Sequence, residues 1–147
     1  KAIQSAQSIL ADHFVDLDAH RICAISYEKL GDSTKSELHE FIRKGILNSV
    51  LSTGDGRTYE TAYRVVRIQE EWAVVQHYNY TFDTQTQVKY GKFWFDILEV
   101  ADWNAKEKKS IYFNIDLPYK YLKKQLKNVP PGLLDLLRML MDPRYTK

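Results

Sequence analysis

The stretch Ser52-Thr53-Gly54-Asp55-Gly56-Arg57-Thr58-Tyr59-Glu60-Thr61-Ala62 separates two differently patterned parts of the chain. Before it, apolar residues recur at helical spacing; after it, β-branched and aromatic residues dominate. The stretch itself combines two glycines with acidic and polar residues that favour turns. Helices that precede a run of strands predict an α+β fold, in which an N-terminal helical hairpin packs on a mostly antiparallel sheet.

Residues 1–53 form the predicted helical part. A short first helix is followed by a clearer one after Asp16, a residue type that caps helix N-termini, and Gly31 is placed to end it. Thr34 and Glu37 have the spacing of a capping box, which predicts the start of the next helix. The two joined helices look like one unit of a tetratricopeptide-style pair, which is too little to predict a repeat array.

Residues 57–116 are expected to be rich in strands. Five segments have strand composition, namely Tyr63 to Ile68, Trp72 to Tyr80, Thr86 to Tyr90, Lys92 to Val100 and Ser110 to Ile115. The segment Glu70 to Val75 is ambiguous, because it also fits the start of a short helix. In Phe93-Trp94-Phe95, neighbouring side chains of a strand point to opposite faces, so both faces of the sheet are expected to be covered there.

Residues 119–142 are predicted to form C-terminal helices, interrupted at Pro130-Pro131-Gly132. The last of them is apolar over most of its circumference, and a helix of this kind must be buried on more than one side. Docking into the domain's own core is favoured, and a protein partner or a second copy of the chain is the alternative. Its apolar contact residues are Leu133, Leu136, Leu137, Leu140 and Met141.

The composition is that of one soluble globular domain spanning residues 1–147, because the chain is 44% hydrophobic and its formal net charge is only +2. A dedicated nucleic-acid binder would show a larger basic excess, so no nucleic-acid partner is predicted. No run reaches the ~18 apolar residues of a membrane span. Cys23 is the sole cysteine, which excludes an intrachain disulfide. The chain begins with Lys1 instead of Met, as expected for a trimmed start.

The loop residues Gly54, Asp55 and Gly56 are the first candidate site. Glycines allow the close backbone approach that phosphate-binding loops need. Such a loop, however, ends in Gly-Lys-Ser/Thr and opens a helix, whereas this one follows a helix and precedes a strand. A structural turn, with Asp55 closing an Asx-type hydrogen bond, is therefore the favoured interpretation.

The second candidate is a pair of histidines, His20 and His39, which lie beside the apolar stripes of the two paired helices and are expected to face one groove. With Asp55 and Glu60 they would form a dispersed acid–base or metal site, in which a histidine is the general base of a hydrolase. Local zinc-binding spacing is missing, so no metal or other cofactor is predicted. Histidines held by structural hydrogen bonds are the favoured alternative.

Carboxylates form the third candidate group. Glu70 and Glu71 cannot serve one pocket if their segment is a strand, because adjacent strand residues point to opposite faces. Glu60, beside the glycine-rich loop, is therefore the better candidate for acid–base work. Its structural alternative is to accept hydrogen bonds from loop amides or to pair with Arg57 or Arg64.

Several motifs together resemble a bacterial family known as domain of unknown function 4919. The matching positions are Asp18 with His20, Leu30-Gly31-Asp32, His39, Thr53 through Ala62, Glu70-Glu71-Trp72, Gln85 and Tyr112-Phe113-Asn114-Ile115-Asp116. Thr53 stands where the family usually has Ser or Ala, and Trp72 where it has Tyr. The resemblance implies an α+β fold without an assigned reaction. It also implies export or lipid anchoring, so a periplasmic or secreted location is favoured over a cytoplasmic one.

A non-enzymatic binding or interaction domain, envelope-associated or of the immunity type, is the favoured function. The helical pair, the aromatic-rich sheet and the apolar last helix support it, because Tyr and Trp bury large areas while keeping a polar group available. The alternative is the hydrolase that uses His20, His39, Asp55 and Glu60, with or without a metal.

Overall fold

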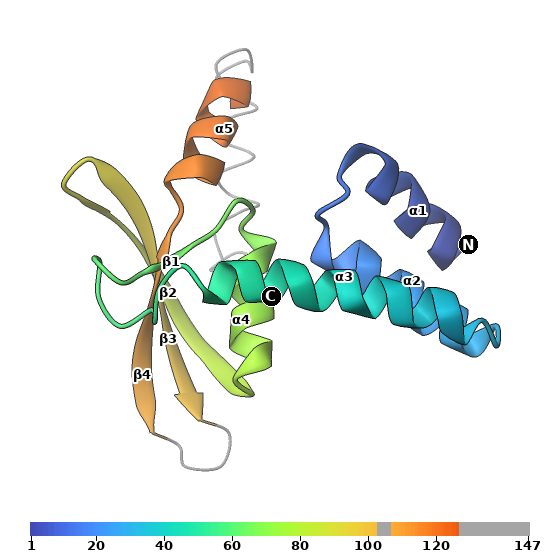
Figure 1. Cartoon of the computed structure of the whole chain (residues 1–147). Coiled ribbons are helices and arrows are strands. Elements are labelled where there is room, and N and C mark those ends of the chain that lie inside the picture. Colours follow the sequence, from blue (N-terminus) through green and yellow to red (C-terminus); the bar gives the residue numbers. More distant parts are fainter. Residues whose placement is uncertain (103–106, 127–147) are drawn as a thin grey trace.

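The computed structural model describes residues 1–102 and 107–126. In this part of the chain the elements are, in order, α1 (Ala2–Asp12), α2 (Leu17–Lys29), α3 (Ser33–Leu51), β1 (Tyr63–Arg64), α4 (Gln69–His77), β2 (Tyr80–Tyr90), β3 (Phe93–Asp102), β4 (Lys108–Asn114) and α5 (Asp116–Leu126). Helices α1 to α3 form an arm beside the sheet (Figure 1). The predicted α+β class, with a mostly antiparallel sheet, is confirmed.

Side-chain caps fix where the two long helices of the arm begin. Asp16 caps α2 as predicted, since its carboxylate accepts a 2.9 Å hydrogen bond from the Ala19 amide. The capping box expected at Thr34 is wrong, because Asp32 caps α3 by accepting from the Lys35 amide. The aspartate lies two residues earlier and therefore starts the helix at Ser33.

The arm packs through small side chains and joins the sheet at one end. Ala6 of α1 meets Ala19 and Cys23 of α2 in a cluster separate from the main core. Leu17 and the last turns of α3 belong instead to the core under the sheet. An ion pair of 3.1 Å between Arg67 and Asp16 ties the start of α2 to the chain beyond β1.

The sheet has the strand order β1-β4-β3-β2, with β1 parallel to β4 and the other pairs antiparallel. The strand expected from Tyr63 to Ile68 is shorter than predicted and covers only Tyr63–Arg64. The reason is local, because the amides of Val66 and Arg67 bond to the Glu70 carboxylate and turn the chain away from the sheet.

The ambiguous segment is resolved as helix α4, so the strand predicted from Trp72 to Tyr80 is wrong except at its last residue. Its buried positions are Glu70, Glu71, Val74 and Val75, at i, i+1, i+4 and i+5, which is a helical and not a strand pattern. Asn79, with φ of 55°, then reverses the chain into β2.

Both faces of the sheet are covered at the Phe93-Trp94-Phe95 run, as predicted. Trp94 stacks on Tyr119 of α5, with ring centroids 4.4 Å apart. On the other face, Phe95 meets the ring of Tyr59, which comes from the 52–62 loop. The main core lies between the sheet and α4, where Phe113 and Leu98 are fully buried.

Helix α5 begins at Asp116, three residues before the predicted start, because Pro118 is tolerated in the first turn of a helix. The predicted interaction residues of the last helix, Leu133, Leu136, Leu137, Leu140 and Met141, lie outside the described residues. Within residues 1–102 and 107–126, no helix has the length and hydropathy needed to cross a bilayer.

Candidate functional site

The 52–62 loop turns tightly because its own groups bond to one another. The Thr61 carbonyl accepts from the amides of Asp55 and Gly56 at 3.0 and 2.8 Å. Asp55 Oδ1 accepts from the Arg57 amide at 3.0 Å, which is the Asx-type bond expected from the sequence. The amide N–H groups of residues 55 to 57 therefore already have acceptors. They leave no backbone nest in which a phosphate could be cradled.

Both glycines of the loop stand where a side chain would not fit. A Cβ on Gly54 would lie 2.1 Å from the Thr61 carbonyl oxygen. Gly56 has φ of +69°, and a Cβ there would lie 2.5 Å from the Tyr63 ring. The Gly56 carbonyl accepts from the Tyr112 amide at 2.8 Å, so the loop continues the pairing along the edge of β4 that faces β1.

The loop also forms one wall of a pocket of about 610 Å³. Side chains from the ends of α3 and α4 and from three strands form the other walls. The lining residues are Leu51, Gly54, Asp55, Gly56, Arg57, Tyr63, Tyr78, Tyr80, Lys109, Ser110, Ile111 and Tyr112. We refer to this site as the tyrosine pocket.

Hydroxyls and one ammonium group meet in the tyrosine pocket. The hydroxyls of Tyr63 and Tyr78 are 3.2 Å apart, and the ring of Tyr78 stacks on that of Tyr80. Lys109 Nζ donates to the Tyr80 hydroxyl at 3.2 Å and lies 4.6 Å from the centre of its ring. The composition did not reveal this arrangement, because the tyrosines come from separate segments.

Neighbouring groups fix the protonation states of three side chains in the pocket. The Thr61 side chain, followed by the Arg57 amide, lowers the pKa of Asp55, which stays ionised. Burial, followed by the hydrogen bond with Tyr78, raises the pKa of Tyr63, so its hydroxyl stays protonated. The hydrogen bond to Tyr80 raises the pKa of Lys109 and keeps it cationic.

The structure brings His20 and His39 together, as the helical spacing suggested. Their Nδ1 atoms are 2.9 Å apart, and His20 Nε2 lies 2.7 Å from the carbonyl oxygen of Phe14. A carbonyl only accepts, so His20 carries its proton on Nε2 and accepts at Nδ1 from the Nδ1–H of His39. Burial, followed by the charge of His20, lowers the pKa of His39. Stacking of His39 on Tyr27 completes the contact.

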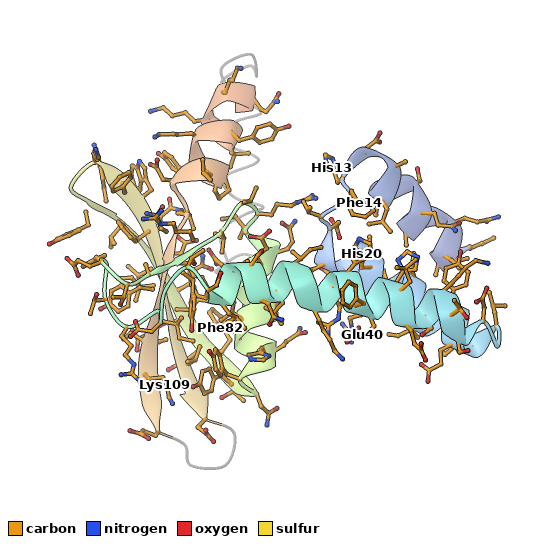
Figure 2. All side chains as sticks on the ribbon, viewed as in Figure 1. His13, Phe14, His20, Glu40, Phe82 and Lys109 are labelled. Carbon is orange, nitrogen blue, oxygen red and sulfur yellow. The ribbon has the colours of Figure 1, made fainter. Side chains whose placement is uncertain are left out.

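Asp55 and Glu60 do not join the two histidines. His39 lies twelve residues before Leu51, the last residue of α3, which is about 18 Å along the helix. Asp55 and Glu60 follow beyond that end and are exposed. Figure 2 shows this separation, since His20 lies in the arm and Lys109 lies on the sheet. In the described part of the chain, no group of three His, Cys, Asp or Glu side chains is arranged to hold a metal ion.

The structure also contains a buried pair of carboxyl groups, Glu71 and Asp96, which the sequence did not predict. Each side chain is only 1% exposed to solvent. Burial, and next the charge of Asp96, raises the pKa of Glu71 to about 9, so Glu71 is protonated and hydrogen-bonds to Asp96. Gln85 and Gln87 donate their side-chain amides to Asp96 at 2.6 and 3.2 Å.

The sequence did contain a signal for this pair. On a helix, Glu70 and Glu71 diverge: Glu70 accepts the amides of the preceding turn, while Glu71 faces the sheet. Gln85 and Gln87 alternate on β2 and so share the face of Asp96, to which Gln87 is directly opposite. Oxygen Oε1 of Glu71 is buried without a hydrogen-bond partner among the described residues.

A second pocket, of about 410 Å³, lies between the arm and α4. It is lined by both charge signs and by apolar groups, including Arg21, Glu40 and Trp72. Glu40 is already held by Arg43 through two hydrogen bonds of 2.7 Å. We refer to it as the arm pocket.

Comparison with known proteins adds one match. Searches of curated proteins and of solved structures found no similar protein. The sequence model of the family described as Domain of unknown function (DUF4919) matches residues 1–126, which include the loop, both pockets and all nine elements of the described part. The chain therefore belongs to the DUF4919 family.

Proposed function

We propose that this protein is a non-enzymatic binding domain whose ligand occupies the tyrosine pocket. The observation that carries the proposal is the convergence of the 52–62 loop with Tyr63, Tyr78, Tyr80 and Lys109 around about 610 Å³. Small-molecule sites of proteins have volumes of about 300–1,000 Å³, with aromatic walls and a few placed polar groups. The volume and the composition of this pocket both fit that description.

The walls of the pocket are held in place before any ligand arrives. Gly54 and Gly56 fix the loop against Thr61 and Tyr63 by close contact. The Tyr63 ring is buried at 4% exposure and presents its hydroxyl to Tyr78. Rigid walls reduce the entropy lost on binding, which supports a binding role for this site.

The position of the histidines favours binding over hydrolysis. A hydrolase would need His20 or His39 to act with Asp55 and Glu60, which lie beyond the far end of α3. The histidines instead bond to each other and to the Phe14 carbonyl. These contacts give the histidines a structural role, which is the alternative to catalysis.

The proposal is tested by a fragment screen with 15N-labelled protein, read by the amide resonances of both pockets. We expect hits to shift resonances of Gly54 to Arg57, Tyr80 and Lys109. The arm pocket, with Arg21 and Glu40, is the internal control of similar exposure. Hits that shift only the arm pocket, or a library that shifts neither set, would overturn the proposal.

A further inference from the structure

We propose that the group recognised in the tyrosine pocket is an oxyanion, such as a carboxylate or a phosphate of the ligand. This inference rests on the proposed function and specifies the chemistry of its ligand. The reason is a surplus of hydrogen-bond donors over acceptors among the groups that line the pocket.

The Tyr63–Tyr78 pair leaves one hydroxyl proton unused. Only one of the two hydroxyls can donate along the 3.2 Å contact, and the other keeps its proton. Tyr63 is the buried partner, at 4% exposure, whereas Tyr78 is 41% exposed. A buried hydroxyl proton without an acceptor is unfavourable, so Tyr63 donates and the Tyr78 proton is available to a ligand.

The Lys109–Tyr80 pair leaves further donors unused. The ammonium donates one of its three protons to the Tyr80 hydroxyl at 3.2 Å. Tyr80 accepts there and keeps its own proton. The pair therefore presents a hydroxyl proton and up to two ammonium protons from one side of the pocket.

Two acceptors that line the pocket, the Asp55 carboxylate and the Gly56 carbonyl, already have donors. Asp55 accepts from the Arg57 amide and from the Thr61 side chain, and its other oxygen lies 3.8 Å from Arg57 Nε. The Gly56 carbonyl accepts from Tyr112. Ser110 donates its hydroxyl to Glu99 and so adds no free donor.

Charge points to the same ligand chemistry. Of the charged residues that line the pocket, Arg57 and Asp55 offset one another, which leaves Lys109 as the excess charge of the lining, with Glu107 and Asp102 acting on its ammonium from outside the lining. An oxyanion would accept from Lys109, Tyr78 and Tyr80 together. Such charge-assisted hydrogen bonds are stronger than those between neutral groups.

The test measures binding of acetate, inorganic phosphate and uncharged glucose to the full chain, followed by amide shifts in the pocket. We expect acetate or phosphate to saturate these shifts, and Lys109→Met to weaken the binding at least about tenfold. Tyr80→Phe removes one donor and should weaken it less. The matched control is Lys108→Met, because Lys108 is the neighbouring lysine, points to the other face and pairs with Asp83.

The outcomes separate this inference from the proposed function. If glucose or a neutral fragment binds the pocket while neither anion does, the pocket is a ligand site but the oxyanion inference is wrong. If no compound of any charge binds there, both are wrong. Equal loss of anion binding in Lys108→Met and Lys109→Met would show nonspecific charge attraction and would also overturn the inference. Which of acetate and phosphate binds more tightly distinguishes the two sources of the oxyanion.

Discussion

The arm and the sheet half each contain a pair of titratable side chains in contact, and the two pairs respond to pH in opposite directions. In the arm, His39 donates to His20, and burial lowers the pKa of His39. In the sheet half, burial beside Asp96 raises the pKa of Glu71 to about 9. Burial favours the neutral form of His39 and of Glu71, which makes the arm sensitive to acid and the sheet half sensitive to base.

The two halves also differ in what they bury. The fully buried residues of the sheet half include Phe113, Leu98 and Ile115. The fully buried apolar residues of the arm are only Ala6, Ala19 and Cys23 among the described residues, while Phe41 of α3 is 74% exposed. Most of the free energy of folding therefore comes from the sheet half, because it depends on the apolar area removed from water.

The largest expected effect is on the pH dependence of stability. The pKa of Glu71 is raised from 4.5 to about 9, so its contribution is complete below pH 4.5 and is lost as the pH rises towards 9. The slope is up to about 1.4 kcal/mol per pH unit, or roughly 5 kcal/mol between pH 5 and 9 as an upper bound. Glu71→Gln keeps a donor for Asp96 and should flatten the slope in urea unfolding curves.

Glu60→Gln is the control for that experiment, because Glu60 is exposed. It should keep the slope of the unmodified protein. If Glu71→Gln and the unmodified protein have the same slope, the two carboxyl groups do not share a proton.

The second prediction compares two phenylalanines. Phe113→Ala should lower the free energy of unfolding by about 3–5 kcal/mol, because Phe113 is fully buried. Phe41→Ala should change it by less than about 0.5 kcal/mol, because that ring is mostly in water. Urea unfolding at one pH measures both. Similar losses would mean that Phe41 is covered in solution and that the contrast between the halves is wrong.

The third prediction compares two glycines. Gly54→Ala should destabilise the protein by about 2–3 kcal/mol, because its Cβ would clash with the Thr61 carbonyl. Gly45→Ala in α3 should stabilise it by about 0.5–1 kcal/mol, since a Cβ there meets no atom within 4 Å and alanine favours helix. Thermal unfolding gives both values. A neutral Gly54→Ala would show that the loop can shift.

The smallest effect is expected in the arm. The lowered pKa of His39 means that its contribution is present above the ordinary histidine value of 6.5 and is lost as the pH falls. Solvent screening keeps the loss below about 1 kcal/mol. Hydrogen exchange of α2 and α3 amides, corrected for intrinsic rates, should show weaker protection at pH 5 than at pH 7. His39→Gln should reduce that difference, and an unchanged difference would place the acid response elsewhere.

The features that sequence could predict are those set by near neighbours along the chain. The Asp16 cap and the turn at Asp55 depend on contacts three and two residues away. The joining of His20 and His39 followed from the predicted hairpin. The local sequence could not decide whether the α4 segment is a helix or a strand. Its valines favour a strand, whereas the spacing of its buried residues favours a helix.

The features that sequence could not predict depend on register between distant segments. Glu71 contacts Asp96 only because β3 packs against α4 with the face that carries Asp96 turned toward the helix. The tyrosine pocket likewise requires Lys109 of β4 to reach Tyr80 of β2. Neither residue pair has a spacing that identifies its partner.

The parallel pairing of Tyr63 with Phe113 has a consequence for the order of folding. The chain must close a loop of about fifty residues before β1 has a neighbour, and such closure slows folding. The arm needs only contacts close in sequence. During synthesis the arm can therefore form while the ribosome is still adding β4. The tyrosine pocket comes into existence only when β4 has emerged.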